Sequence, residues 1–255
     1  MGLRPLTSSD LDVWLTPSEL AREPSLVARY AALLSEEERA RHARIIHEET
    51  RHQFLVARAL IRTTMSRYSG GTPEHWLFQV NEYGRPALRA GQTDLDLRFN
   101  LSHTHGLVAC AVALGRDVGI DVEWNRRNPS ILDSVERFFS PAEVSDLHAL
   151  PPSARAERFF QVWTLKESYI KAHGMGLSMP LSGFSFRLAS DAEGESAINI
   201  EMTLGEGPGQ GPGPWPGPWQ FWLWNPTSEH TLGLSAAFPR DAPVNLRVEK
   251  TIPLT

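Results

Sequence analysis

The sequence contains one cysteine, Cys110, among its 255 residues. A single thiol excludes an internal disulfide framework and any zinc site built from several cysteines. Long apolar runs are also missing, since the longest, 107–114, is far shorter than the ~20 residues needed to cross a bilayer. Residues 1–15 lack the basic flank and apolar stretch of a signal peptide. We therefore expect a soluble, cytoplasmic protein with no membrane partner.

Neither sign of charge dominates, because 25 Lys and Arg residues stand against 30 Asp and Glu residues, for a net charge of −5. This balance excludes a global attraction to nucleic acid, so any anion site must be local. The sequence is rich instead in large apolar side chains, and its 8 Trp and 11 Phe residues exclude global disorder. A chain of this length buries enough surface for a substantial core.

The first half of the sequence has helix signals before its strand signals. Residues 18–34 predict a helix that is interrupted near Pro24. Residues 35–38, Ser-Glu-Glu-Glu, have the form of a capping box, and the near-helical spacing of later apolar residues predicts one long helix from there to about Tyr68. Gly, Asn or Asp residues then separate apolar stretches that predict short strands over 76–80, 99–101, 107–114 and 118–123.

The second half has the same order of signals. Residues 140–143, Ser-Pro-Ala-Glu, form another capping-box pattern with Pro at the first helical position. A further helix is predicted from about Ser153 to His173, with Gly174 as a left-handed cap. Strands are predicted again over 183–189, 197–204, 220–225 and 231–238.

These patterns predict two similar halves. The segments 99–113 and 221–238 are both typical of a strand, a polar turn and an apolar strand. We expect an N-terminal subdomain over 1–117 and a C-terminal subdomain over 118–255. The run 205–219 is rich in Gly and Pro and predicts an extended surface loop, with a proline-rich ligand for a partner as the alternative.

Two acids stand two residues apart in 118–123, Val-Gly-Ile-Asp-Val-Glu. On a strand, Asp121 and Glu123 share one face. Neighbouring carboxylates repel each other and favour a cation between them. Such hard oxygen ligands suit Mg²⁺, which usually also takes phosphate oxygens. The alternative is an exposed strand end that carries acids without a ligand.

The helix predicted over 153–173 carries a second group of charges. Glu167 and Lys171 lie one turn apart, and Lys166 comes directly before the acid. An ordinary surface ion pair, worth a few tenths of a kcal/mol, is the simplest interpretation. Large apolar residues share nearly the same helix face, however, so the face is expected to be partly buried. A carboxylate and two lysines in such surroundings indicate a site for an anion and a metal.

A third group is 99–106, Phe-Asn-Leu-Ser-His-Thr-His-Gly. Its two histidines lack a third His or Cys at a spacing that suits zinc. Ser102 and His103 are adjacent, and adjacent residues on a strand point to opposite faces, which disfavours a nucleophile and base pair. Anion binding by donors at a strand end is the simplest functional interpretation, and a capped turn is the structural one.

Five segments occur in the order and spacing of a known family. They are Asn-Glu-Tyr-Gly-Arg-Pro at 81–86, Phe-Asn-Leu-Ser-His at 99–103, Gly-Ile-Asp-Val-Glu at 119–123, Arg-Phe-Phe-Ser at 137–140 and Trp-Thr-Leu-Lys-Glu-Ser-Tyr-Ile-Lys at 163–171. Together they resemble the 4'-phosphopantetheinyl transferases of the long, monomeric, surfactin-synthetase-activating type. The specific part of the resemblance covers residues 35–190, and the remainder agrees only in length and strand pattern.

The resemblance implies an α+β fold of two similar subdomains related by a pseudo-twofold axis, with the active site in the cleft between them. It implies an enzyme that moves 4'-phosphopantetheine from coenzyme A to a serine of an apo acyl, peptidyl or polyketide carrier protein and releases 3',5'-ADP. Mg²⁺ is the expected metal, with Mn²⁺ as the alternative. The carrier's pathway is left open.

The resemblance also implies roles for particular residues. The expected metal ligands are Asp121, Glu123 and Glu167. The expected contacts of coenzyme A are Arg41, Arg44, Arg85, Ser102, His103, Lys166 and Lys171. Glu167 is the candidate base for the serine proton, and Lys171 is expected to stabilise phosphate charge. Glu38 occupies another position that is basic in the family, and Arg44 could substitute for it.

Two other functions use the same residue types. A Mg²⁺-dependent nuclease also needs acids and lysine, but the chain is net acidic and no Glu-x-Lys pair follows Asp121. A non-catalytic module of the same fold that binds coenzyme A or a carrier is the second alternative. The presence of all three acids and both lysines favours the enzyme.

Overall fold

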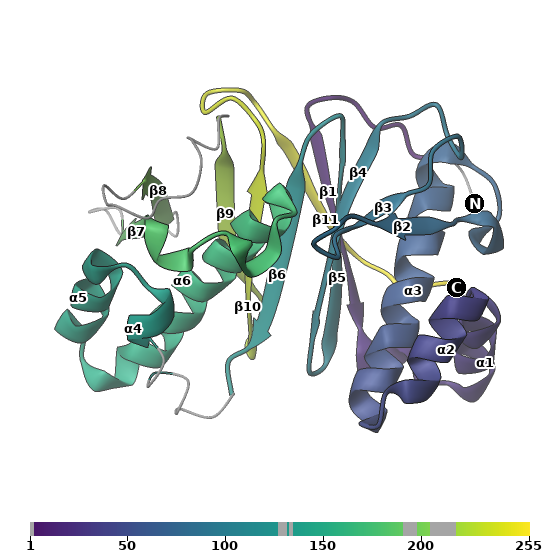
Figure 1. The fold of residues 1–255 in the computed structure, drawn as a ribbon, viewed down its shortest axis with the longest axis horizontal. Helices are drawn as coiled ribbons and strands as arrows, with labels where there is room; N and C mark the ends of the chain where they lie inside the picture. The colour runs from purple at the N-terminus through teal and green to yellow at the C-terminus, as the bar shows by residue number, and fades with distance from the viewer. Residues whose placement is uncertain (1–2, 127–131, 133–134, 191–197, 205–217) are drawn as a thin grey trace.

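The computed structural model describes residues 3–126, 132, 135–190, 198–204 and 218–255. One order of elements occurs twice along the chain: a strand, a group of helices of which the last has 22 residues, and two hairpins. Figure 1 shows the two sets side by side, the first in purple and blue and the second largely in green. This repeat confirms the expected α+β fold with two similar halves.

The first set consists of β1 (Asp10–Pro17), α1 (Pro24–Ala32), α2 (Glu36–Arg44), α3 (Glu48–Ser69), β2 (Phe78–Val80), β3 (Pro86–Leu88), β4 (Leu97–Thr104) and β5 (Leu107–Leu114). The second set consists of β6 (Val118–Trp124), α4 (Val135–Phe138), α5 (Pro141–Ala149), α6 (Pro152–His173), β7 (Phe184–Ser190), β8 (Ile198–Leu204), β9 (Gln220–Thr227) and β10 (His230–Ala236). The last strand is β11 (Asn245–Lys250). Short 3₁₀ turns cover Ser18–Ala21, Pro73–His75, Gly176–Ser178 and Leu181–Gly183.

Two main sheets pack against each other in the middle of the molecule. Their strand orders are β11-β1-β5-β4 and β6-β10-β9. In each half, the first strand pairs antiparallel with the second strand of the second hairpin, β1 with β5 and β6 with β10. Fully or almost fully buried residues such as Val13, Ala111, Ile120 and Leu234 fill the space between the sheets. The helices α3 and α6 lie on the outer sides (Figure 1).

Two glycines allow α6 to lie directly on its sheet. A Cβ at Gly119 in β6 would collide with the carbonyl oxygen of Ser168 and would lie 2.5 Å from the nitrogen of Ala172. A Cβ at Gly233 in β10 would lie 2.5 Å from the carbonyl carbon and oxygen of Thr164. The absence of side chains at these two positions therefore sets how closely the charged residues of α6 approach β6.

Local signals located most of the helix ends correctly. Ser35 and Ser140 both form capping boxes, and Gly174 closes α6 with a left-handed backbone at φ 71°. The prediction of one continuous helix from 35 to 68 was wrong. The chain is extended at Ile45 and His47, with ψ of 115° and 121°, and it divides into α2 and α3 there.

The sequence patterns did not predict β1 or β11. Strand β11 runs parallel to β1, so the end of the chain returns to the sheet of the first half. Strand β11 thus lies in the predicted C-terminal subdomain by sequence but pairs with a strand of the N-terminal one. The boundary between the two subdomains at 117/118 stays a prediction. The Gly- and Pro-rich run 205–219 falls mostly outside the described residues, which resume at 218.

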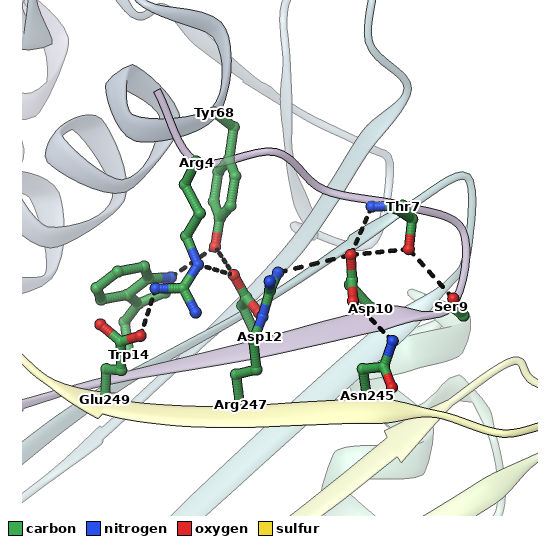
Figure 2. A network of polar contacts seen from close by, with 10 residues as sticks. All are labelled: Arg4, Thr7, Ser9, Asp10, Asp12, Trp14, Tyr68, Asn245, Arg247 and Glu249. Atoms are coloured by element: carbon green, nitrogen blue, oxygen red, sulfur yellow. Dashed lines mark hydrogen bonds and ion pairs between the residues drawn. The ribbon is translucent and has the colours of Figure 1, made fainter. Parts of the chain in front are cut away.

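A buried polar network joins β1 to β11 and to α3 (Figure 2). Asp12 of β1 is 1% exposed and pairs with Nε of Arg4 at 2.9 Å and Nε of Arg247 at 2.5 Å. Tyr68 of α3 donates its hydroxyl hydrogen to Asp12 over 2.6 Å and accepts from the indole of Trp14 over 2.7 Å. The network satisfies the buried carboxylate and ties both ends of the chain to the first sheet.

Candidate active site

The two sheets meet edge to edge where β4 runs beside β6. Side chains of β4 replace the usual backbone ladder at this edge. Asn100 Oδ1 accepts from the backbone nitrogen of Ile120 at 3.0 Å, and Ser102 Oγ accepts from that of Val122 at 3.3 Å. Since α6 packs on β6, side chains from both halves converge at this edge.

Asp121 is the centre of this convergence. It is 5% exposed, and its Oδ1 accepts from Lys171 Nζ at 2.6 Å and from Ser102 Oγ at 3.0 Å. Its other oxygen, Oδ2, is buried and has no hydrogen-bond partner among the described residues. A buried carboxylate oxygen without a partner is costly, so this atom is suited to a ligand that the chain itself does not provide.

A cavity of about 350 Å³ opens beside Asp121. Its lining includes all three predicted acids, together with Lys171, His103 and Trp163. Burial raises the pKa of Glu167, and the charge of Asp121 raises it further, while Lys171 opposes them. Asp121 and Glu167 thus repel each other in a partly dry space.

The donor set fits a hard divalent cation. The acids offer only oxygen atoms, and Asp121 Oδ2 has no hydrogen-bond partner in the part of the chain that the structure describes. Among the described residues, no group of three or more His, Cys, Asp or Glu side chains is close enough to form a complete metal site. Mg²⁺ and Mn²⁺ commonly keep several waters, so an incomplete set of protein ligands is compatible with either.

Ser102 has all its hydrogen-bonding capacity occupied by the protein. Its hydroxyl donates to Asp121 and accepts from Lys171 Nζ at 3.0 Å and from the Val122 nitrogen. A hydroxyl has one donor and two acceptor positions, and all three are in use. Ser102 therefore holds Asp121 and Lys171 in place, and its predicted contact with coenzyme A would require it to give up one of these bonds.

His103 also lines the cavity of the acids. Withdrawal from bulk water lowers the pKa of its imidazole, and the positive charges of Lys171 and Arg58 lower it further. Its Nδ1 lies 3.2 Å from Oε1 of Gln53 on α3. Sequence reasoning missed Gln53, because nothing in the helical pattern marks which polar residue of α3 faces β4.

The predicted arginines of α2 lie in a separate, larger cavity. Arg41 and Arg44 line a hollow of about 560 Å³ between α2, α3 and the hairpin β2–β3. Arg58, Arg62 and Arg89 add to its positive charge. The last three were not predicted, since α3 and the hairpin come together here only in the folded chain.

Glu38 has a structural role in this cavity. It completes the capping box with the backbone nitrogen of Ser35 at 3.0 Å. It also pairs with Arg62 at 2.6 Å and with Arg58 at 3.6 Å. The acid at this position therefore pairs with the buried Arg62 and the half-buried Arg58, and it leaves Arg41, Arg44 and Arg89 as the exposed cations of the cavity.

Arg85 lies between the two cavities, in a hollow of about 290 Å³ that also contains Glu167 and Lys171. Its Nη1 donates to the carbonyl of Ala172 at 2.6 Å, and its Nη2 pairs with Asp117 at 3.2 Å. The guanidinium thus ties the turn before β3 to the end of α6. Much of its bonding capacity is already used within the protein.

Lys166 does not line any of these three cavities. Its side chain is fully buried and its Nζ bonds to Glu143 at 2.8 Å and to the carbonyls of Leu181 and Phe184 at 2.7 and 2.6 Å. It points into the core of the second half, whereas the next residue, Glu167, lines the cleft. Successive helical residues point about 100° apart, and here this separation places Lys166 in the core and Glu167 in the cleft. The structure therefore does not bring Lys166 to the cavities that hold the other predicted residues, and its contact with coenzyme A stays a prediction.

Comparison with known proteins decides the family. Residues 22–114 match the family model described as 4'-phosphopantetheinyl transferase, N-terminal, and residues 117–233 match that of the 4'-phosphopantetheinyl transferase superfamily. The chain belongs to the 4'-phosphopantetheinyl transferase superfamily. The two matches together cover both halves, including every predicted site residue.

Curated relatives of this phosphopantetheinyl transferase have the same activity in their names. A 4'-phosphopantetheinyl transferase of Bacillus subtilis is 39% identical over 71% of this chain and 76% of its own length. The transferase Sfp of Bacillus subtilis strain 168 is 35% identical over 71% of this chain and 76% of its own length. The transferase HetI of a Nostoc species is 35% identical over 68% of this chain and 72% of its own length. The resemblance drawn from the motifs, to transferases of the surfactin-synthetase-activating type, is therefore confirmed.

Proposed function

We propose that the chain transfers 4'-phosphopantetheine from coenzyme A to a serine hydroxyl of an apo carrier protein and releases 3',5'-ADP. The observation that carries this proposal is the convergence of Asp121, Glu167 and Lys171 in one cavity at the junction of the two halves. Phosphoryl transfer depends mainly on positioning and on charge compensation, and this cavity offers both.

The neighbouring cavities support a long, anionic donor. The hollow around Arg85 shares Leu101, Glu167 and Lys171 with the cavity of the acids, and it shares Pro86 with the arginine cavity. The hollow around Arg85 therefore adjoins both of the other cavities. In our proposal, the arginine cavity takes the nucleotide end of coenzyme A, whose 3'-phosphate suits paired guanidinium bonds. The pyrophosphate then lies near Lys171 and the acids.

The charged side chains of the cleft divide the remaining work. Lys171 donates to the phosphate oxygens on which charge develops, and its bond to Asp121 orients the ammonium beforehand. Glu167 is the group proposed to accept the hydroxyl proton of the carrier serine. Its raised pKa makes its carboxylate a stronger base than an exposed one. A Mg²⁺ or Mn²⁺ ion held by Asp121, Glu123 and Glu167 would supply further positive charge at the pyrophosphate.

A mass measurement tests this function directly. The chain is incubated with coenzyme A, Mg²⁺ and a panel of apo acyl, peptidyl and polyketide carriers. We expect one of them to gain the mass of phosphopantetheine, and kcat/KM across the panel identifies the physiological class. Binding of coenzyme A without transfer to any carrier would favour the non-catalytic module. Salt-sensitive binding of DNA in place of transfer would favour a nuclease.

We further propose that the enzyme acts as a cytoplasmic monomer. Helices of the described residues include none that is long and apolar enough to cross a membrane. Both halves of the site come from one chain, so a second copy is not needed to complete it. A native mass measurement at working concentration checks the oligomeric state, and a stable dimer would contradict it.

A further inference from the structure

The contact between His103 and Gln53 gives a role to a residue outside the predicted site. Gln53 belongs to α3 and is 5% exposed. Its Oε1 lies 3.2 Å from Nδ1 of His103. The two residues come from different elements, α3 and β4, so the contact depends on the packing of the helix against the sheet.

The orientation of the Gln53 amide is determined by its other partners. Its Nε2 donates to the carbonyl oxygen of Thr104 at 2.9 Å and to Oε1 of Glu49 at 3.0 Å. A flipped amide would place its oxygen against two acceptors and would lose both bonds. Glu49 is itself held by an ion pair with Arg22. The carbonyl end of Gln53 must therefore face His103.

The hydrogen on the imidazole follows from this orientation. A carbonyl oxygen only accepts, so Nδ1 of His103 must carry a hydrogen. In a neutral ring, Nε2 then has the free lone pair. Since Nδ1 is turned toward α3 and the side chain lines the cavity of the acids, Nε2 is the nitrogen left to face a ligand there.

We propose that Gln53 is a positioning residue that fixes His103 as the Nδ1–H tautomer and presents the Nε2 lone pair as an acceptor to a hydroxyl or amino group of the donor. The identity of that donor, coenzyme A, rests on the proposed function. The tautomer does not, because it follows from the contacts of Gln53 alone. Without Gln53, the ring has two accessible tautomers and can turn, so only part of the population is prepared for the ligand.

Nuclear magnetic resonance of ¹⁵N-histidine protein tests the tautomer. The His103 signals are assigned by their loss in His103→Gln, and spectra are taken at about pH 8, where the ring is neutral. We expect the wild-type ring to have its hydrogen on Nδ1. Gln53→Met keeps the length of the side chain but cannot accept, so both tautomers should appear. Gln161→Met, the same change on α6 in a residue bonded to Arg158, should leave His103 unchanged. A wild-type ring with its hydrogen on Nε2, or an unaltered ring in Gln53→Met, would overturn the proposal.

Kinetics test the link to the donor. We expect Gln53→Met to raise KM for coenzyme A by about 10-fold, the lower end of what loss of an orienting partner costs, with a smaller change in kcat. Gln161→Met should behave as wild type. An unchanged KM together with mixed tautomers would show that Nε2 does not meet the donor. If Gln53→Met fails to fold, the resonance spectrum of the wild-type protein still tests the proposal, because it shows which nitrogen of His103 carries the hydrogen. A wild-type protein that transfers to no carrier contradicts the proposed function, not the tautomer.

Discussion

Lys166 Nζ lies 2.8 Å from Glu143 Oε2, and both side chains are almost completely buried. Glu143 also closes the capping box of α5 and accepts from the backbone nitrogen of Phe186. Lys166 bonds to two carbonyls next to β7. The pair therefore joins α5, α6 and β7, and it holds α6 in the rotation that turns Glu167 into the cleft.

Lys166→Met should destabilise the fold rather than weaken binding of coenzyme A. Removal of one partner leaves a buried carboxylate unpaired, at a cost of about 3–5 kcal/mol in the free energy of unfolding. Urea denaturation measures this loss, and Lys166→Met combined with Glu143→Leu should recover part of it. A Lys166→Met protein of normal stability with a raised KM for coenzyme A would return Lys166 to the binding set.

Substitution of the cleft acids should separate catalysis from stability. We expect Asp121→Asn and Glu167→Gln each to lower kcat/KM by at least about 100-fold, because phosphate charge is then poorly compensated. The free energy of unfolding should change little, since either substitution relieves the repulsion between the two acids. In Asp121→Asn this relief offsets a weaker bond to Lys171. Glu123→Gln should cost less, since a water can replace one ligand of the metal.

Mn²⁺ binding and an exposed control make this prediction specific. Electron paramagnetic resonance should show weaker Mn²⁺ binding in all three variants. Asp146→Asn on the exposed side of α5 should match wild type in rate and in Mn²⁺ affinity. Near-normal transfer by Asp121→Asn or Glu167→Gln would contradict the site assignment.

Periodicity and capping signals were enough to predict most of the second half. Both ends of α6 are marked locally, by prolines at its start and Gly174 at its end, and the alternation of Asp121 and Glu123 correctly placed both acids along one cavity. Strand β1 was missed because both of its faces are buried, and because Trp14 interrupts the alternation of polar and apolar residues along it.

The remaining differences between sequence and structure concern partners that are distant in sequence. Nothing near Lys166 reveals that Glu143 pairs with it, so its motif predicted a phosphate contact. The break between α2 and α3 was missed because Ile46 was counted in the apolar stripe, although it is 89% exposed in the fold. Gln53 could be recognised only once α3 was seen against β4.

Acid should destabilise the protein through His173 at the end of α6. Burial lowers the pKa of this imidazole from its usual 6.5 to about 4, although Asp117 opposes the shift. The unfolded chain therefore binds a proton at a higher pH than the folded chain does. Stability is unaffected above about pH 6.5 and falls as the pH drops from there toward 4.

His173→Gln should remove this part of the pH dependence. With allowance for solvent screening, we expect the wild-type loss to be about 1–2 kcal/mol over this interval. Urea denaturation at several pH values gives the difference between the two proteins. An identical slope in both would mean that the folded ring titrates as it does in the unfolded chain.

Gly119→Ala should impair both stability and transfer. The new Cβ would collide with the backbone of α6 at Ser168 and Ala172, and backbone cannot move aside as a flexible side chain does. We expect a loss of about 1–3 kcal/mol, typical of overpacking, and a displaced α6 that carries Glu167 and Lys171 away from β6. Ala111→Gly in β5 is the control, because it changes a buried strand residue without pushing α6 away from β6. Gly115→Ala is less suitable, since the positive φ at this turn would itself strain an alanine. Normal transfer by Gly119→Ala would show that the spacing of α6 and β6 is not critical.

The 3'-phosphate of coenzyme A should distinguish Arg41 from Arg85. Arg41 lines the arginine cavity and is exposed there, whereas Arg85 already bonds to Ala172 and Asp117. Charge-assisted bonds to a phosphate contribute roughly 1.5–3 kcal/mol, so wild type should prefer coenzyme A over its dephospho form by about 10- to 150-fold in kcat/KM. Arg41→Ala should lose much of this preference, being slow with coenzyme A and nearly unchanged with the dephospho form. Arg85→Ala should be slowed equally with both, because it loosens the turn against α6. A loss of rate with coenzyme A alone in Arg85→Ala would contradict this expectation. It would mean that in the wild type the Arg85 guanidinium leaves the Ala172 carbonyl and binds the 3'-phosphate, in agreement with the coenzyme A contact expected from the sequence motif.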